Sequence, residues 1–199
     1  RFGELPSSDE LDTWREELSG YALLHENIRE LVRAFRYDAH PMGTFTSTVA
    51  ALSTFYPESR NVQDAETRQL NIKRLIAKVP SIAALTFRHS QGLHFVLPDD
   101  ELSYAGNFLS MMFRKTERRY EPNPVLERAL EVLLILHADH EQNCSTTAMR
   151  TIGSSLADPY LSLAGAAAAL SGPLHGGANQ KVLEMLHRVG TVSNVPDFI

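Results

Sequence analysis

Apolar side chains recur every three or four residues along most of the chain, with charged and polar side chains between them. In the segment 64–78, for example, leucines and isoleucines alternate with arginines and lysines at this spacing. Such a period places the apolar side chains on one face of an α-helix, which can bury that face against other helices. The pattern predicts an all-α, multi-helical protein of about ten helices, without repeats or linkers.

Capping residues and prolines bound the predicted helices. We expect Ser8, with Glu10 near the helix start, to cap the first helix, and Asp158 to cap a later one. Pro80 interrupts a strong helical pattern, which is predicted to resume after a kink. A short extended run predicts a small β-hairpin near residues 92–98. The expected helices cover residues 10–18, 23–35, 42–55, 64–78, 81–88, 104–113, 123–137, 145–155, 161–170 and 180–186.

Composition places the chain among ordinary globular proteins. Its 199 residues are 43% hydrophobic and 22% charged, which suits one domain with a sizeable core. The net charge is −5 and the pI is near 5.9. Because contacts with phosphates need clustered Lys and Arg, this balance argues against binding to nucleic acid.

Two further features bear on the compartment. Cys144 is the single cysteine, so the chain holds no disulfide framework, which suits a reducing compartment. The most apolar run, Leu161–Leu170, is shorter than the roughly 20 residues that a membrane span needs. We therefore expect a soluble intracellular protein, in the cytoplasm or an organelle matrix, with no membrane partner.

Residues with catalytic potential gather in the stretch Ile135–Lys181. His137, His140 and Glu141 are three and four residues apart at the end of an apolar helical run, so they share one face and can point into one cavity. A hydrogen-bonded core position is the more ordinary role for His137. Asn143, just after these residues, favours a functional role for His140.

His175 has a different setting, because glycines flank it at the start of a helical pattern. Glycine lets a ligand approach the backbone closely, and the positive end of a helix favours a neutral imidazole. A neutral histidine can donate one hydrogen bond to a carbonyl oxygen that is becoming negative, as the histidine of triosephosphate isomerase does. This turn is therefore suited to enolisation.

Three segments resemble a known family: SYAGNFLSMMF at 103–113, NPVLERALEVLLILHADHEQNCST at 123–146 and GPLHGGANQKVLEML at 172–186. They are similar to the large helical domain of citrate synthases, and their sequences most resemble those of the bacterial hexameric branch of that family. The resemblance covers nearly the whole chain. It implies an all-helical homodimer or a larger homo-oligomer.

The resemblance also implies roles for individual residues. The histidine of the family's GPLHGGAN turn holds the acetyl-CoA carbonyl during enolisation, which makes His175 the expected catalytic residue. His140 and Asn143 fall where the family binds oxaloacetate, and His137 is expected beside them. Acyl-CoA is then a substrate, and neither a metal nor another cofactor is implied. The residues expected in the CoA loop are Leu174, Gly176, Gly177, Ala178 and Asn179.

Part of the family's active site has no match in this sequence. The second catalytic histidine, the aspartate base and the arginines that clamp substrate carboxylates follow a segment like Val195–Phe198 in the family pattern. Residues 1–199 are therefore expected to be a portion of the large domain, truncated at both ends and without the small domain. We expect this portion to be inactive by itself and to expose apolar patches such as Leu161–Leu170.

Three other interpretations stay open. A longer acyl-CoA substrate would make the protein a methylcitrate or alkylcitrate synthase. A truncated relative could act only as a dimerising module. Glu184 and His187 have the Glu-x-x-His spacing of di-iron bundles, and His137 with His140 could share a metal. Such a bundle also needs a second motif and two further glutamates.

Overall fold

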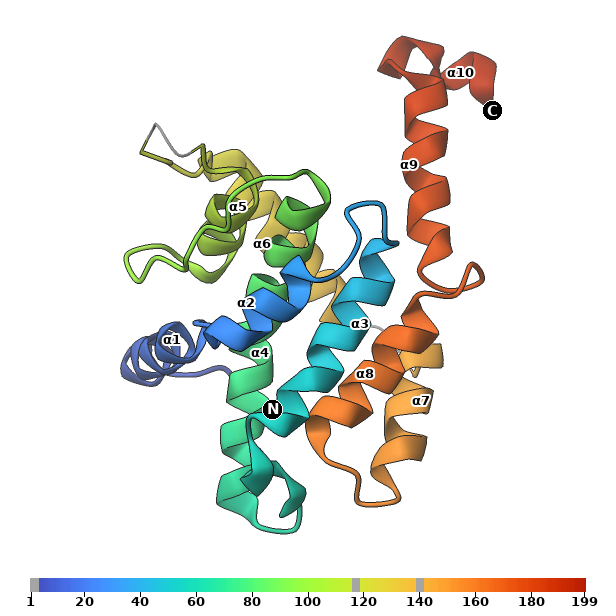
Figure 1. The fold of residues 1–199 in the computed structure, drawn as a ribbon. Coiled ribbons are helices and arrows are strands. Elements are labelled where there is room, and N and C mark those ends of the chain that lie inside the picture. The colour runs from blue at the N-terminus through green and yellow to red at the C-terminus, as the bar shows by residue number, and fades with distance from the viewer. Residues whose placement is uncertain (1–3, 116–118, 139–141) are drawn as a thin grey trace.

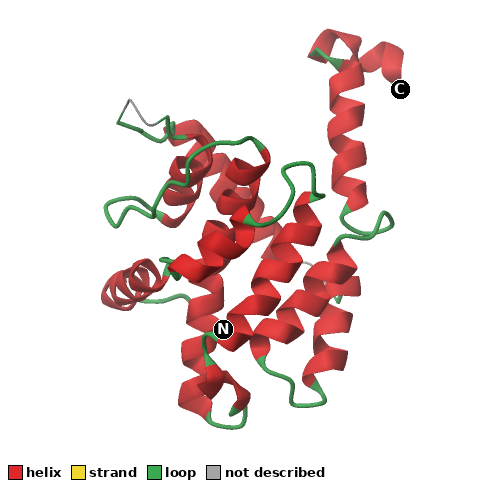
Figure 2. Cartoon of the chain, viewed as in Figure 1, coloured by secondary structure: helices red, strands yellow, loops and turns green. Residues whose placement is uncertain are grey.

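The computed structural model describes residues 4–115, 119–138 and 142–199, and in these ranges it contains only helices and loops (Figures 1 and 2). The prediction of an all-α fold is confirmed. The elements in chain order are α1 (Ser8–Tyr21), α2 (Glu26–Arg33), α3 (Pro41–Ala51), η1 (Leu52–Thr54), η2 (Pro57–Arg60), α4 (Ala65–Ser90), α5 (Tyr104–Phe113), α6 (Pro124–Ala138), α7 (Cys144–Gly153), α8 (Pro159–Leu170), α9 (Gly177–Val189), η3 (Val192–Asn194) and α10 (Val195–Phe198).

Local sequence signals set the helix starts. The N-cap of α1 is Ser7 and not Ser8 as predicted, because a capping box needs its glutamate three residues after the cap. The Ser7 hydroxyl accepts from the Glu10 N–H, and the Glu10 carboxylate accepts from the Ser7 N–H at 2.8 Å. Asp158 caps α8 as predicted, with its carboxylate accepting from two backbone N–H groups.

The β-hairpin predicted near residues 92–98 is wrong, because this segment is an irregular loop between α4 and α5. Side chains of the flanking helices, and not a second strand, pair with its backbone. Arg88 of α4 donates its Nε–H to the carbonyl of His94. Asn107 of α5 accepts from the N–H of Asp99 at 3.1 Å. These contacts replace the ladder that a hairpin would form.

One helix, α4, contains both of the segments predicted on either side of Pro80. Proline has no N–H, so the carbonyl of Ile76, four residues earlier, loses its helical partner. The hydroxyl of Tyr104 in α5 donates to this carbonyl at 2.8 Å. The helix therefore continues through the proline, and the same hydrogen bond fixes α5 against α4.

The core lies where α8 packs against α3 and α4. Tyr160 of α8 is fully buried, and its hydroxyl donates to Asn71 Oδ1 of α4 at 2.7 Å. Burial raises the pKa of the Tyr160 phenol, so this group stays protonated as a donor. The helix predicted at 42–55 is confirmed by α3 and η1. The buried apolar residues of this cluster are Ile28, Val49, Leu52, Leu75, Ile82, Tyr160 and Ala164.

A buried lysine joins the end of α1 to α4. Lys78 is 4% exposed, and its Nζ donates to the carbonyls of Tyr21, at 2.7 Å, and Leu23. Ser81 donates to the carbonyl between them at 2.8 Å. Burial, and to a smaller degree repulsion from Arg74, lowers the pKa of Lys78 to about 8. Polar groups of α4 therefore pair with three successive carbonyls at the end of α1 and directly after it.

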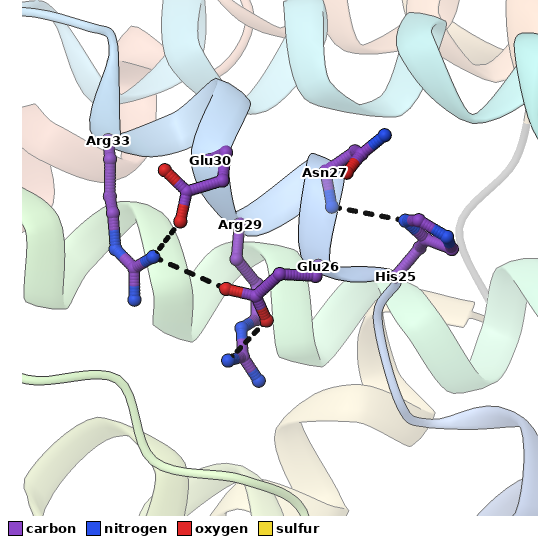
Figure 3. Close-up of polar contacts among 6 residues, drawn as sticks. All are labelled: His25, Glu26, Asn27, Arg29, Glu30 and Arg33. Carbon is purple, nitrogen blue, oxygen red and sulfur yellow. Dashed lines mark hydrogen bonds and ion pairs between the residues drawn. The ribbon is translucent and has the colours of Figure 1, made fainter.

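The helix α2 carries its own network of ion pairs (Figure 3). His25 caps the helix, with its Nδ1 accepting from the N–H of Asn27 at 3.0 Å. Both arginines of α2 are paired with glutamates of the same helix, so their charges are neutralised locally. The pairs are Arg29–Glu26, Arg33–Glu26 and Arg33–Glu30.

The helix α6 is rich in apolar residues and yet buries none of them. Leu133, Ile135 and Leu136 are 50%, 62% and 62% exposed. The exposed apolar patch predicted at Leu161–Leu170 is confirmed only in part. Leu161 and Leu170 are exposed, whereas α8 buries three of its alanines, and α8 packs against α3 and α7. The larger exposed apolar surface belongs to α6. No helix within the described ranges combines the length and apolar character that a membrane span requires.

Candidate functional site

His175 lies in the turn that joins α8 to α9, where α9 extends away from the other helices (Figure 1). The helix α9 begins at Gly177, so the histidine immediately precedes its N-terminal end, as predicted. The N–H groups of His175 and Gly177 both donate to the carbonyl of Gly172, at 3.0 and 3.2 Å. These hydrogen bonds close the turn and leave the partly buried histidine side chain on its edge.

A serine of α7 contacts the His175 ring. Ser145 Oγ lies 2.8 Å from His175 Nε2, and it donates to the carbonyl of Ala166 in α8 at 2.9 Å. A hydroxyl has one proton, so in this arrangement Ser145 accepts from the Nε2–H of the histidine. The neutral ring then has no proton on Nδ1.

The Ser145 hydroxyl can also turn and donate to Nε2 instead of to the Ala166 carbonyl. The ring proton of a neutral His175 then resides on Nδ1. In that tautomer Nδ1–H can donate to the carbonyl oxygen of a ligand. The hydroxyl of Ser145 therefore selects which nitrogen of His175 is the donor.

Glycines allow the close packing that brings these groups together. A Cβ on Gly165 of α8 would lie 2.1 Å from Ile152 Cδ1 of α7, so the glycine lets these helices approach. A Cβ on Gly176 would lie 2.2 Å from the carbonyl oxygen of Leu170. Gly176 thus makes room for the end of α8, a packing role that the sequence pattern does not indicate.

Asn143, predicted to bind substrate, is the N-cap of α7. Its Oδ1 accepts from the N–H of Thr146 at 3.0 Å. No described residue accepts a hydrogen bond from the side-chain NH₂ group, which has the chemistry to donate to an oxygen of a ligand. Because Asn143 comes two residues before Ser145, the start of α7 supplies both polar groups.

The two other predicted histidines differ in what the structure describes. His137, in the last turn of α6, donates from Nδ1 to the carbonyl of Leu133 at 2.7 Å. Its side chain is exposed, so the expectation of a core position is wrong, whereas the expected hydrogen bond is present. No hydrogen bond joins it to His175 in the described part of the chain. His140 and Glu141 lie outside the described residues.

The residues predicted for the CoA loop surround His175 in the turn and the first turn of α9. Leu174 is fully exposed, and Ala178 and Asn179 are exposed as well. Gly176, against the end of α8, and Gly177, against the turn itself, are partly buried. The turn therefore presents an apolar side chain to solvent directly beside His175.

The Glu-x-x-His motif of the metal hypothesis lies on the exposed helix α9. Glu184 accepts from Lys181 Nζ at 2.7 Å and from Gln180 Nε2 at 3.1 Å, and these bonds lower the pKa of its carboxyl group. No three His, Cys, Asp or Glu side chains come together as possible metal ligands in residues 4–115, 119–138 and 142–199.

Ser145 is the residue of this site that the sequence analysis misses. A serine in the first turn of a helix is common, so its position gives no sign of a contact with a histidine 30 residues later. The contact depends on how α7 packs against α8. The sequence indicates this contact only indirectly. The glycine and alanines of α8 let α7 and α8 pack closely.

The fold and the site together define a class of protein. It is an all-α protein in which a histidine just before one helix contacts a serine at the start of another, and an asparagine caps the helix that carries the serine. Such a site suits the binding of a carbonyl compound and the stabilisation of its enol.

Comparison with known proteins identifies the family. The whole chain, residues 1–199, matches the sequence family described as "Citrate synthase, C-terminal domain". It is 51% identical to the peroxisomal citrate synthase of Dictyostelium discoideum over 99% of the chain, and 43% identical to the glyoxysomal citrate synthase of Cucurbita maxima over 100% of it. The chain belongs to the citrate synthase family.

Solved structures agree with this result. The structure of citrate synthase from Pyrobaculum aerophilum matches 96% of this chain with a TM-score of 0.85 and 38% sequence identity. The chain spans 48% of that protein, and 42% and 40% of the two curated relatives. Two predictions are not tested by these comparisons: that the sequence is most similar to the bacterial hexameric branch, and that the protein divides into a large and a small domain.

Proposed function

We propose that the protein is a citrate synthase, an acyltransferase that condenses acetyl-CoA with oxaloacetate to give citrate and CoA. The observation that carries this proposal is the pairing of His175 with Ser145 in a chain that belongs to this family throughout its length. The relatives described above are all named citrate synthases. Their names favour acetyl-CoA over the longer substrates of methylcitrate or alkylcitrate synthases.

In the proposed reaction, His175 donates a hydrogen bond to the thioester oxygen of acetyl-CoA while a base removes a methyl proton. The α-proton of a thioester is weakly acidic, so both steps are needed, and each contributes about 10²-fold or more. The enol carbon then forms a bond to the ketone carbon of oxaloacetate. Water hydrolyses the thioester, and CoA leaves as the thiol.

Oxaloacetate is proposed to bind near the start of α7. The side-chain amide of Asn143 would donate to one of its oxygens, together with His140 and with His137 from the end of α6. No residue of this sequence matches the base or the arginine clamps of the family, so we propose that another part of the protein supplies them. We also propose that the protein forms a homo-oligomer, as the resemblance implies.

Replacement of His175 tests the assignment. In the complete protein, His175→Ala is expected to lower turnover by roughly 10² or more, because it removes stabilisation of the forming enolate oxygen. The assay measures release of free CoA from acetyl-CoA and oxaloacetate. His187→Ala, at an exposed histidine of α9, is the matched control and should keep full turnover. Near-normal turnover of His175→Ala would contradict the proposal.

A second assay asks where the base lies. The 199-residue chain by itself is expected to release no CoA, and activity should appear when the remaining part of the protein is added. Activity of residues 1–199 alone would show that they contain the base.

A further inference from the structure

A hollow lined by cations lies where the end of α4 meets the end of α5. Its volume is about 470 Å³, and Arg88, Arg114 and Lys115 contribute to its walls. Its described lining residues include no Asp or Glu. The helix α5 and the loop before it lie on the opposite side of the helices from α9, so this hollow is separate from the turn that carries His175 (Figure 1).

Arg88 is a buried guanidinium that pairs with no carboxylate among the described residues. It is 4% exposed, and its hydrogen bonds go to three neutral backbone carbonyls. Its Nη2 has no acceptor within the described ranges. Burial lowers the pKa of Arg88, yet a guanidinium remains protonated at neutral pH. Buried charges in proteins are normally paired with an opposite charge, and no described residue around Arg88 provides one.

The two other cations of the hollow are Arg114 and Lys115. Neither Arg114 nor Lys115 forms an ion pair with a carboxylate in the part of the chain that is described. The arginines of α2, in contrast, are each neutralised by a glutamate (Figure 3). The chain as a whole is acidic, with 24 Asp and Glu against 19 Lys and Arg. Positive charge gathered around a hollow whose described walls carry no carboxylate attracts anions.

One wall of the hollow is aromatic and apolar. The rings of Phe87 and Phe113 meet edge to face, with their centroids 6.0 Å apart, and Leu93 and Met112 lie beside them. Phe113 and Leu93 are exposed. Hollows of a few hundred Å³ with apolar walls and a few polar groups are typical binding sites for small molecules.

We propose that this hollow is a binding site for a small aromatic phosphate. Three cations suit the two negative charges of a phosphate monoester, and Arg88 Nη2 can donate to one of its oxygens. The aromatic wall can pack against the ring of the ligand. The proposal does not rest on the proposed citrate synthase activity, because the hollow includes none of the residues assigned to that reaction.

Titration with phenyl phosphate tests the proposal, followed by amide shifts in ¹⁵N-labelled protein at low salt. We expect a dissociation constant on the order of 1 mM, with shifts confined to residues 87–94 and 112–115. Inorganic phosphate and phenol, which each carry one half of the ligand, should bind about tenfold more weakly. Equal binding of inorganic phosphate and phenyl phosphate would overturn the aromatic part of the proposal.

Variants at the surface cations distinguish this site from non-specific binding. Arg114→Gln with Lys115→Gln should weaken phenyl phosphate binding about tenfold without unfolding, since both side chains reach solvent. Arg128→Gln removes an exposed cation from α6 and should leave binding unchanged. Unchanged binding in the double variant, shifts centred elsewhere, or no binding in the complete protein would each overturn the site.

Discussion

At the scale of single residues, the donor atom of His175 depends on a hydroxyl from another helix. Ser145 can hold the ring as the Nε2–H tautomer while donating to the Ala166 carbonyl, or it can donate to Nε2 itself. Only the second arrangement leaves a proton on Nδ1 of the neutral ring. The proposed chemistry therefore depends on a residue that need not touch the substrate.

Removal of this hydroxyl should affect turnover more than substrate binding. We expect Ser145→Ala to lower kcat of the complete protein by about tenfold and to leave KM for acetyl-CoA almost unchanged. Without the hydroxyl, nothing from Ser145 selects the tautomer of the His175 ring, but the ring stays at the same position in the turn. Ser154→Ala, which removes a hydroxyl bonded within the same helix, is the control. An unchanged kcat in Ser145→Ala would rule out the positioning role.

The glycine after His175 gives a test of packing. Gly176→Ala should lower the free energy of unfolding by about 1–3 kcal/mol, since its Cβ would lie 2.2 Å from the Leu170 carbonyl oxygen and the turn must shift. Urea denaturation measures this change. Gly153→Ala in α7, where a Cβ meets nothing within 4 Å, should be neutral or stabilising. Similar effects of the two substitutions would show that the turn is not closely packed.

At the scale of elements, side chains of neighbouring helices satisfy the backbone groups that the helices themselves leave unpaired. Tyr104 pairs with the carbonyl freed by Pro80, and Lys78 pairs with one carbonyl in the last turn of α1 and one just after it. Such contacts fix the position of one helix against another while they remove the cost of a buried unpaired carbonyl.

A double-mutant cycle measures the first of these contacts. Tyr104→Phe should destabilise the protein by about 1–2 kcal/mol, because the Ile76 carbonyl loses its donor. In a Pro80→Ala background, residue 80 has an N–H that can reach the same carbonyl, so the effect of Tyr104→Phe should become smaller. The free energies of unfolding in urea give the coupling. Equal effects of Tyr104→Phe in both backgrounds would mean that the hydroxyl does not compensate for the proline.

The buried Lys78 predicts a dependence of stability on pH. Its pKa in the folded protein is about 8, below the ordinary 10.5, so the unfolded state binds more protons between these values. The free energy of unfolding should therefore rise from pH 8 toward pH 10.5, by at most about 3 kcal/mol, and this gain is lost as the pH falls through 8.

Replacement of the lysine isolates this contribution. Lys78→Met should remove the rise between pH 8 and pH 10, whereas Lys181→Met, at an exposed lysine of α9, should keep it. Urea denaturation across this range gives the comparison. A rise of the same size in Lys78→Met would assign the pH dependence to other groups.

At the scale of the whole molecule, α6 exposes a large apolar surface. A helix with apolar residues on several faces is usually buried, yet every residue of α6 is at least partly exposed here. An apolar surface of this kind marks an interaction site or promotes association. The homo-oligomer implied by the family resemblance is consistent with such a surface.

Charged substitutions on α6 test this association. The chain is expected to self-associate in sedimentation experiments, and Leu133→Glu with Ile135→Glu should shift it toward the monomer, because both side chains are exposed and apolar. Val192→Glu, at an exposed apolar residue outside α6, should leave the association unchanged. A monomer at all concentrations in the unsubstituted chain would contradict the prediction.

The sequence by itself determined the helical fold and the position of its most informative residue. The three-to-four-residue period predicted α5 at its observed bounds, and it placed α3 and α7 within a few residues of theirs, because this period depends on local geometry alone. Flanking glycines and a following helical pattern singled out His175 for the same reason. The family resemblance, which rests on contiguous segments, also needed no structure.

Only the tertiary structure decided the features that join distant parts of the chain. It showed that α4 continues through Pro80, because the donor to the Ile76 carbonyl is Tyr104 of another helix. It replaced the predicted hairpin at 92–98 with a loop whose backbone is bound by Arg88 and Asn107. It also brought Ser145 to His175 through the packing of α7 on α8. Periodicity reports which face of a helix is apolar, whereas these contacts depend on which helix packs against that face.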